Sequence, residues 1–214
     1  MQPRDSRPAI PAAPNLILLP SVASLDASDA QIRDGDPSVL GLTLTRRTVM
    51  AARRAGYGQI FFLARDRGAP PGTTMIVDWS RLADALLPSQ TTSLVIAPAT
   101  ILSETGWLKG LAATQIEPAA WAAILDQIIV LAATAVPDAL AVLQAEGGAS
   151  DLSAVQERLT RRFGSAAAAA VPRGRVLEVG SEGTEVGVDV LQPQHVVASE
   201  REPVFLDELI HDSP

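Results

Sequence analysis

Short runs of apolar residues mark the first half of the chain. Three of them lie within 16–19, 59–64 and 93–97. Such runs predict strands buried on both faces of a parallel sheet. Between the first two, apolar residues recur at helical spacing over 42–55 and Gly56 follows. This pattern predicts a helix ended by glycine, and so a βαβ unit whose first loop is the usual place for a nucleotide.

The alternation of strands and helices continues after the third run. A short strand is expected at 75–77, in a region otherwise rich in glycine and proline. Ser80 is a candidate N-cap for a helix that extends to residue 87, and Ser103 for a helix over 104–112.

The segment 117–135 has two interpretations. Its large apolar residues stand at helical spacing, which predicts a covered helix for part of it. The run IIVLAA at 128–133 suits a strand equally well.

The last third of the chain adds helices and a pair of strands. Helices are predicted over 137–145 and 151–163, the second capped by its first residue, an aspartate. Residues alternate in strand fashion over 175–179 and 185–190, which predicts a hairpin-like pair, and 192–200 is expected to be helical. The order predicts one doubly wound, mostly parallel α/β sheet with a late strand pair.

Length and composition fit a single folded domain. A chain of 214 residues suits one α/β domain, placed here at 15–201. The Pro-rich start, 1–14, is expected to be a disordered leader, and 202–214 an acidic tail. Because only 4% of the residues are aromatic, the core must consist mainly of Ala, Leu, Val and Ile.

Charge and cysteine content exclude several classes of function. A net charge of -7 argues against non-specific nucleic-acid binding, which depends on Lys and Arg. The absence of cysteine excludes disulfides, thiolate nucleophiles and zinc–cysteine sites. No apolar run is long enough to span a bilayer, and the start is not a secretory signal. We therefore expect a soluble cytoplasmic protein without a membrane span.

Three stretches, taken in order, resemble nucleotidyltransferase domains of the sugar-nucleotide pyrophosphorylase and MobA-like NTP transferase type. LGLTLTRRTVMAARRAGYGQIFFLAR resembles the helix and strand that follow the nucleotide-binding loop of that family. SLVIAPATILSETGWLKGL resembles its central strand and next helix, and VGVDVLQPQHVVASERE its closing segment. The matching positions in the first stretch are Gly41, Leu42, Leu44, Arg47, Ala55, Gly56 and Ile60, and in the last Asp189, Pro193, Ala198 and Glu200.

The overall spacing is most similar to the cytidylyltransferase domain that is fused to CDP-alcohol phosphatidyltransferases. The resemblance implies a Rossmann-like nucleotidyltransferase fold and a Mg²⁺ cofactor if the protein is active. It implies a nucleotide at the loop after the first strand, where Ser21, Arg33, Gly35 and Gly41 would contact it. It also implies a possible membrane CDP-alcohol phosphatidyltransferase as partner.

The loop from 20 to 41 departs from the family pattern. The family places several glycines, a basic residue and a lysine there, because backbone N–H groups and cations bind the triphosphate. Before Gly41 this loop has one glycine, Gly35, and one cation, Arg33, and the only lysine of the chain is Lys109. Its four aspartates would repel a polyanion unless metal ions intervened; they are Asp26, Asp29, Asp34 and Asp36.

The expected metal ligands are also reduced. The family's magnesium-binding aspartate falls near Ala97 and Pro98, which have no ligating side chain. Of the closing acidic pair, Asp189 remains and Leu191 replaces the other. Asp189 is either a residual metal ligand or the cap of the helix expected near Gln192. The catalytic residues are left unknown.

Two hypotheses for function follow. The first is a diverged nucleotidyltransferase-like protein, weakly active or non-catalytic, with a degenerate active site that binds a nucleotide-like ligand or a protein partner. The alternative is an active Mg²⁺-dependent enzyme of phospholipid headgroup synthesis, with Asp189, Asp34 and Asp36 arranged around the metal. It would join an NTP to a phosphorylated alcohol or sugar and release pyrophosphate. A third idea is a scaffold for a separately encoded membrane phosphatidyltransferase.

Overall fold

The structure is a computed structural model of the whole chain. It describes residues 13–20, 38–39, 42–64, 69–86, 93–99, 101–125, 127–145, 151–172, 174, 176–179 and 188–190. Most of the predicted leader, the loop over 21–37, the helix expected over 192–200 and the acidic tail lie outside these residues.

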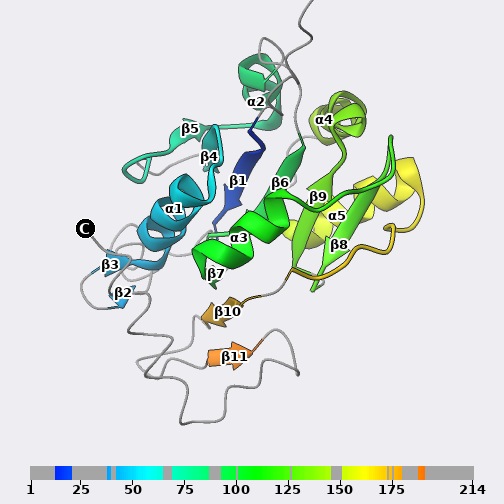
Figure 1. Cartoon of the computed structure of the whole chain (residues 1–214). Coiled ribbons are helices and arrows are strands. Elements are labelled where there is room, and N and C mark those ends of the chain that lie inside the picture. The colour runs from blue at the N-terminus through cyan, green and yellow to red at the C-terminus, as the bar shows by residue number, and fades with distance from the viewer. Residues whose placement is uncertain are drawn as a thin grey trace, which may run out of the picture.

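A six-stranded sheet in the order β5-β4-β1-β6-β9-β8 forms the centre of the molecule (Figure 1). The first four of these strands are parallel, β9 is antiparallel to β6, and β8 is antiparallel to β9. The chain builds outward from β1 first to one side and then to the other, as the doubly wound α/β prediction requires. The strands are β1 (Asn15–Leu19), β4 (Ile60–Leu63), β5 (Thr74–Ile76), β6 (Leu94–Pro98), β8 (Trp121–Ile124) and β9 (Ile128–Leu131).

Helices cover both faces of this sheet. The helices are α1 (Leu44–Ala55), α2 (Trp79–Leu86), α3 (Thr105–Ala112), α4 (Val136–Ala145) and α5 (Leu152–Phe163), with a 3₁₀ turn η3 (Ala133–Ala135) before α4. Ile17 and Leu19 of β1 pack with α2, α4 and α5, whereas Leu16 and Leu18 pack with α1 and α3. Every residue of β1 is buried, which explains why its sequence is a continuous apolar run.

Helix α1 follows the predicted boundaries closely. The Arg46 N–H donates to Thr43 Oγ1 over 3.3 Å at its start, and Gly56 ends it at φ 93°. Three of its arginines, Arg46, Arg53 and Arg54, lie on the solvated face, whereas Arg47 is buried.

Two predicted helix caps are wrong, although the helices themselves are confirmed. The Arg81 N–H donates to Asp78 Oδ1 over 2.8 Å, so Asp78 rather than Ser80 caps α2. Ser103 belongs to strand β7 (Ile101–Ser103), and Glu104 takes the N-cap position of α3. The cap of α5 is confirmed, because Asp151 Oδ1 accepts the Ala154 N–H over 2.7 Å.

The segment 117–135 forms the β8–β9 hairpin, so the strand interpretation is confirmed and the helix is wrong. Ile124 pairs with Ile128 across a short turn in which Leu125 has φ 56°. Both strands are almost fully buried. Because a strand buried on both faces shows no polar alternation, its apolar positions fit helical spacing by chance.

The late strand pair is confirmed and extends β7 into a second small sheet. β10 (Val176–Val179) pairs antiparallel with both β7 and β11 (Val188–Val190), in the order β11-β10-β7. A further two-stranded sheet joins β2 (Ser38–Val39) and β3 (Leu42–Thr43) just before α1. Figure 1 shows both small sheets below the main sheet, β2 and β3 beneath α1 and β10 and β11 beneath β7.

Candidate functional site

The fold places a candidate site where β1 and β6 lie side by side. The chain continues from β1 to β4 on one side, and β6 lies on the other side of β1. Ligands of open α/β sheets bind outside the carboxyl ends of the strands at such a switch point. The loop that follows β1 and the chain that follows β6 both start at the carboxyl ends of these two strands, which we call the switch-point edge.

Apolar residues and backbone hydrogen bonds close this edge at β6. Ala97 and Pro98 pair in register with Leu18 and Leu19 of β1. The Ala99 N–H then donates to the Leu19 carbonyl over 2.7 Å, which ties the chain after β6 to the end of β1. No side-chain oxygen is available at these positions of β6 to hold a magnesium ion, so the residues present do not fit the family's metal site.

The first turns of α1 pack against β7, which follows β6 at the switch-point edge. The Thr48 hydroxyl donates to the Ile101 carbonyl in β7, three residues after Pro98. Thr45, Arg47 and Thr48 are all buried polar residues in this part of the helix. Burial lowers the pKa of the Arg47 guanidinium from its ordinary value by desolvation, although an arginine remains charged at neutral pH. The first turns of α1 therefore contain a buried cation.

The burial of these polar residues of α1 was not predicted from the sequence. Thr45, Thr48 and Ala52 stand three and four residues apart, which places them on one side of the helix. A threonine pair that continues an apolar stripe is the signal for buried hydroxyl groups, and it was available in the sequence.

Asp189 is placed by the small sheet. Its Cα pairs with Glu178 of β10, and Glu178 pairs with Ile101 of β7. Two strand spacings separate Asp189 from Ile101 along this row, a distance of about 10 Å. Its roles as metal ligand or helix cap both stay predictions, because residues 191–200 lie outside the described part of the chain.

The predicted nucleotide contacts cannot be placed. Ser21, Arg33, Gly35 and Gly41 lie outside the described residues, as do Asp34 and Asp36. Within the described part, no group of three or more histidine, aspartate or glutamate residues is close enough to hold a metal ion. In the same part, no helix is both long and apolar enough to cross a membrane.

Two buried polar groups next to the site have no hydrogen-bond partner. Within the described chain, Ser103 Oγ and Trp107 Nε1 are buried and unpartnered, at the end of β7 and in the first turns of α3. Leaving such a group without a partner costs about 1–3 kcal/mol. The sequence suggested a capping role for Ser103, and the strand position of this residue removes it.

We expect Ser103→Ala to stabilise the protein by about 1 kcal/mol, because it removes an unpaired hydroxyl with almost no loss of volume. Thr48→Val is the matched control. It should destabilise by about 1–2 kcal/mol, because it leaves the Ile101 carbonyl without its donor. Urea denaturation of both variants checks the prediction, and a loss of stability in Ser103→Ala would contradict it.

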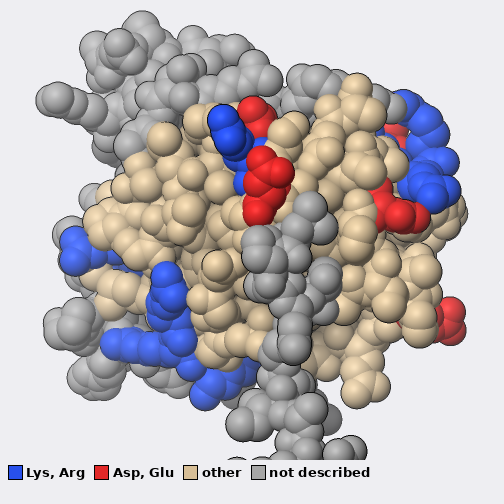
Figure 2. Space-filling view, turned by 90° about the horizontal axis from the view of Figure 1, so that it is seen from above, with Lys and Arg blue, Asp and Glu red and all other residues tan. Residues whose placement is uncertain are grey.

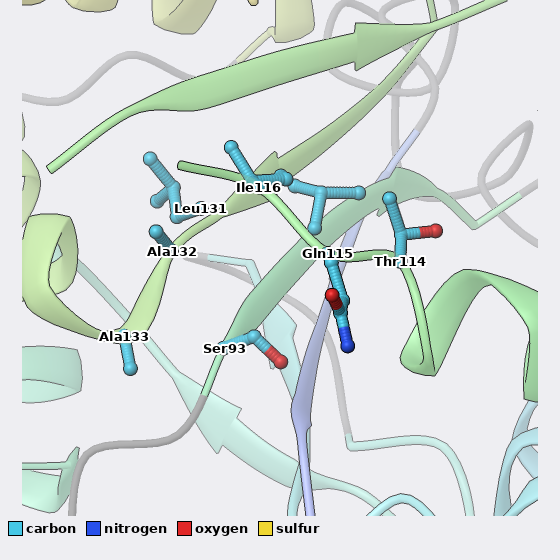
Figure 3. Close-up of a pocket in the computed structure, with 8 residues that line it drawn as sticks. Ser93, Thr114, Gln115, Ile116, Leu131, Ala132 and Ala133 are labelled. Atoms are coloured by element: carbon cyan, nitrogen blue, oxygen red, sulfur yellow. The ribbon is translucent and has the colours of Figure 1, made fainter. Parts of the chain in front are cut away.

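A shallow pocket of about 260 Å³ lies at the opposite end of the sheet (Figure 3). Ser93, which precedes β6, lines it, and the Ser93 carbonyl accepts the Asn15 N–H at the start of β1. The pocket is therefore at the amino ends of β1 and β6, away from the switch-point edge. The lining consists of Ser93, Thr114, Gln115, Ile116, Val130, Leu131, Ala132 and Ala133.

Exposed charges at this end of the sheet fall into separate groups (Figure 2). The basic group on the right in Figure 2 lies over α5, where Arg161 pairs with Glu157 and Arg162 with Asp138 of α4, each at 2.9 Å. These pairs are more than half exposed, so each contributes little to stability. The group at the lower left lies over α1, which carries no acidic residue.

No family model matches the chain, and no curated protein matches it in sequence. Among solved structures, a hypothetical transferase structure from Thermus thermophilus is similar over 71% of this chain and 89% of that chain. The identity is 14% and the TM-score 0.33.

Proposed function

We propose that this protein is a diverged nucleotidyltransferase-like domain that binds a nucleotide-like ligand or a protein partner at the switch-point edge and is weakly active or non-catalytic. The apolar end of β6 carries the proposal. Ala97 is 3% exposed and Ala99 is bonded back to β1. Phosphoryl transfer from an NTP depends on a metal ion to neutralise charge, and this strand offers it no ligand.

Binding without turnover is supported by the first turns of α1. A helix N-terminus carries unpaired N–H groups and favours anions. Here the N-cap Thr43 ends β3, and the buried cationic Arg47 stands one turn into the helix. Neither feature depends on a metal ion, so the helix N-terminus and the positive charge behind it would favour a ligand with phosphate groups without one.

Thermal melting of the protein with each of the four NTPs tests such binding. We consider an NTP present at about ten times its dissociation constant. A ligand that binds only the native state stabilises it by RT ln(1 + [L]/Kd), about 1.4 kcal/mol in this case. For a domain of this size the melting temperature should rise by about 3–5 °C for at least one NTP. Pyrophosphate release with a phosphorylated alcohol should stay at the background rate.

Asp189→Ala, with Glu178→Ala as matched control, separates the two hypotheses. Glu178 is the cross-strand partner of Asp189, so both variants remove one carboxylate from the same small sheet. If the protein is non-catalytic, both variants should keep the melting shift of the wild type, with or without Mg²⁺. Turnover far above the background rate that Asp189→Ala abolishes and Glu178→Ala preserves would refute the proposal and support the active enzyme.

The active enzyme remains the second candidate because of the small sheet. The order β11-β10-β7 brings Asp189 to within two strands of the chain that leaves β6. A metal-dependent reaction would then rely on Asp189 with carboxylates of the 21–37 loop, in place of the family's aspartate in the central strand. Its substrates would be an NTP and a phosphorylated alcohol or sugar.

A further inference from the structure

The two edges of the main sheet differ in how they are covered. At the β8 edge, the Ala167 N–H donates to the Trp121 carbonyl over 2.8 Å, so the segment after α5 protects that strand. At the other edge, no strand among the described residues pairs with β5 on its outer side. Sheet edges left open in this way are sites where another strand can add.

The β5 edge is uncharged and exposes two large apolar side chains. Met75 and Val77 are each 40% exposed, and they are two of the three large hydrophobic residues exposed in the described chain. The sequence from Ala69 to Val77 contains no charged residue. Natural proteins usually protect a free edge with lysine, proline or a bulge, and β5 itself has none of these.

The backbone of β5 has groups free to pair outward. The Ala64 N–H donates to the Ile76 carbonyl over 3.0 Å, so Ile76 faces β4. Because N–H and C=O groups alternate in direction along a strand, those of Met75 point away from β4. Val77 and Thr73 share this outward direction, although the Thr73 N–H is used by the Pro70 carbonyl.

We propose that β5 is a homodimer interface, where two copies of this chain pair antiparallel about a two-fold axis at Met75. In this register Met75 lies opposite Met75 of the second copy, and Val77 opposite Thr73. Met75 would exchange two N–H···O bonds with its copy. The Val77 N–H groups would donate two more to the Thr73 carbonyls, once the pairing extends one residue beyond each end of β5. The two Met75 side chains would then bury each other.

Charge complementarity favours a second copy in this register. Arg53 donates to the Gly72 carbonyl over 2.9 Å, which places a guanidinium beside the turn that leads into β5. The two-fold pairing brings Asp78 of the second copy, which follows its Val77, toward the turn at Gly72 and so toward Arg53. The same contact repeats on the other side of the axis, as an isologous interface requires.

Cysteine substitution tests the register directly, because the chain has no cysteine. Directly opposite residues in a hydrogen-bonded antiparallel pair have Cα atoms about 5.5 Å apart, within the range that a disulfide bridges. Under mild oxidation Met75→Cys should form a covalent dimer. The control is Val171→Cys, at a site 37% exposed and away from β5 in the sequence. We expect it to cross-link at least about tenfold more slowly, because its thiols meet only by random collision.

Sedimentation analysis of the wild type should show a dimer that forms with increasing concentration. Met75→Lys should be monomeric, since the side chain is exposed and the added charge opposes pairing. Its melting temperature should equal that of the wild type at concentrations low enough for the wild type to be monomeric as well. The proposal would be overturned if the wild type stayed monomeric at about 0.5 mM, a concentration well above the dissociation constants of specific interfaces. Equal cross-linking of the two cysteine variants would overturn it as well.

Discussion

Ala97→Asp should lower the free energy of unfolding by about 4 kcal/mol at pH 7. Ala97 is 3% exposed and packs in the cluster between β1, β6, α1 and α3. A carboxyl group there would be desolvated, and its pKa would rise by about 3 units above its ordinary value. Each unit corresponds to about 1.4 kcal/mol between the protonation states.

The pH dependence of this variant has a definite sign. The folded-state pKa of the introduced carboxyl group would be raised, so destabilisation is greatest well above that pKa. It should decline as the pH falls toward the unfolded value of about 4. Urea denaturation at pH 7 and at pH 4.5 measures the difference, and Pro98→Asp is the control, at a half-buried neighbouring position. Recovery of Ala97→Asp by Mg²⁺, but not by the same concentration of Na⁺, would show that this edge accepts a metal ion after all.

Gly174→Ala should destabilise the protein by about 2–4 kcal/mol. Gly174 has φ 128°, and an added Cβ would lie 2.9 Å from Trp107 Cβ and 3.2 Å from the Trp107 backbone nitrogen. Trp107 is fully buried in α3 and cannot move aside. The backbone around Gly174 must therefore shift, which loosens β10 where Val176 pairs with Ser103.

Substitutions at two other glycines distinguish the cost of backbone strain from the cost of a steric clash. Gly164 has φ 83° but open space around its missing side chain, so Gly164→Ala should cost about 1 kcal/mol from strain alone. Gly106 has open space inside α3, so Gly106→Ala should stabilise by up to about 1 kcal/mol through helix propensity. Denaturation curves that rank Gly174→Ala no worse than Gly164→Ala would contradict the packing explanation.

The NTP affinity of Gly174→Ala would show whether the β11-β10-β7 sheet is part of the site. β11 is held only by β10 among the described strands, so Gly174→Ala should also disturb the position of Asp189. If Asp189 contributes to the site, NTP affinity should fall in this variant although the loop after β1 is untouched. If affinity is unchanged while stability falls, the small sheet is not part of the site.

The parallel strands and their helices could be predicted because their sequence patterns are local. The run of buried residues in β1 and the glycine after α1 each have one clear structural meaning. The β8–β9 hairpin was ambiguous because its turn uses Leu125 at positive φ, with no glycine or Asn-Gly pair to mark it. Its strands, buried on both faces, also lack alternation.

The site was harder to predict because its properties depend on tertiary contacts. The burial of Arg47 and the bond from Thr48 to Ile101 arise only when α1 packs against β7. The same holds for Ser103, whose neighbours in sequence suggest a cap, and whose pairing with Val176 makes it a strand residue. By contrast, the lack of a carboxylate at Ala97 and Pro98 was visible in the sequence, and the fold places both residues at the end of β6, beside β1.

The contrast between the hairpin and the central strand has a consequence for how the chain folds. β8 and β9 are joined by a short turn, whereas β1 pairs only with strands far away in sequence. Hairpins of this kind form within microseconds, but parallel pairings must first close long loops and are slow. The hairpin should therefore form before β1 enters the sheet. Since β1 precedes both of its neighbours, a growing chain must complete β6 before its first strand can be fully covered.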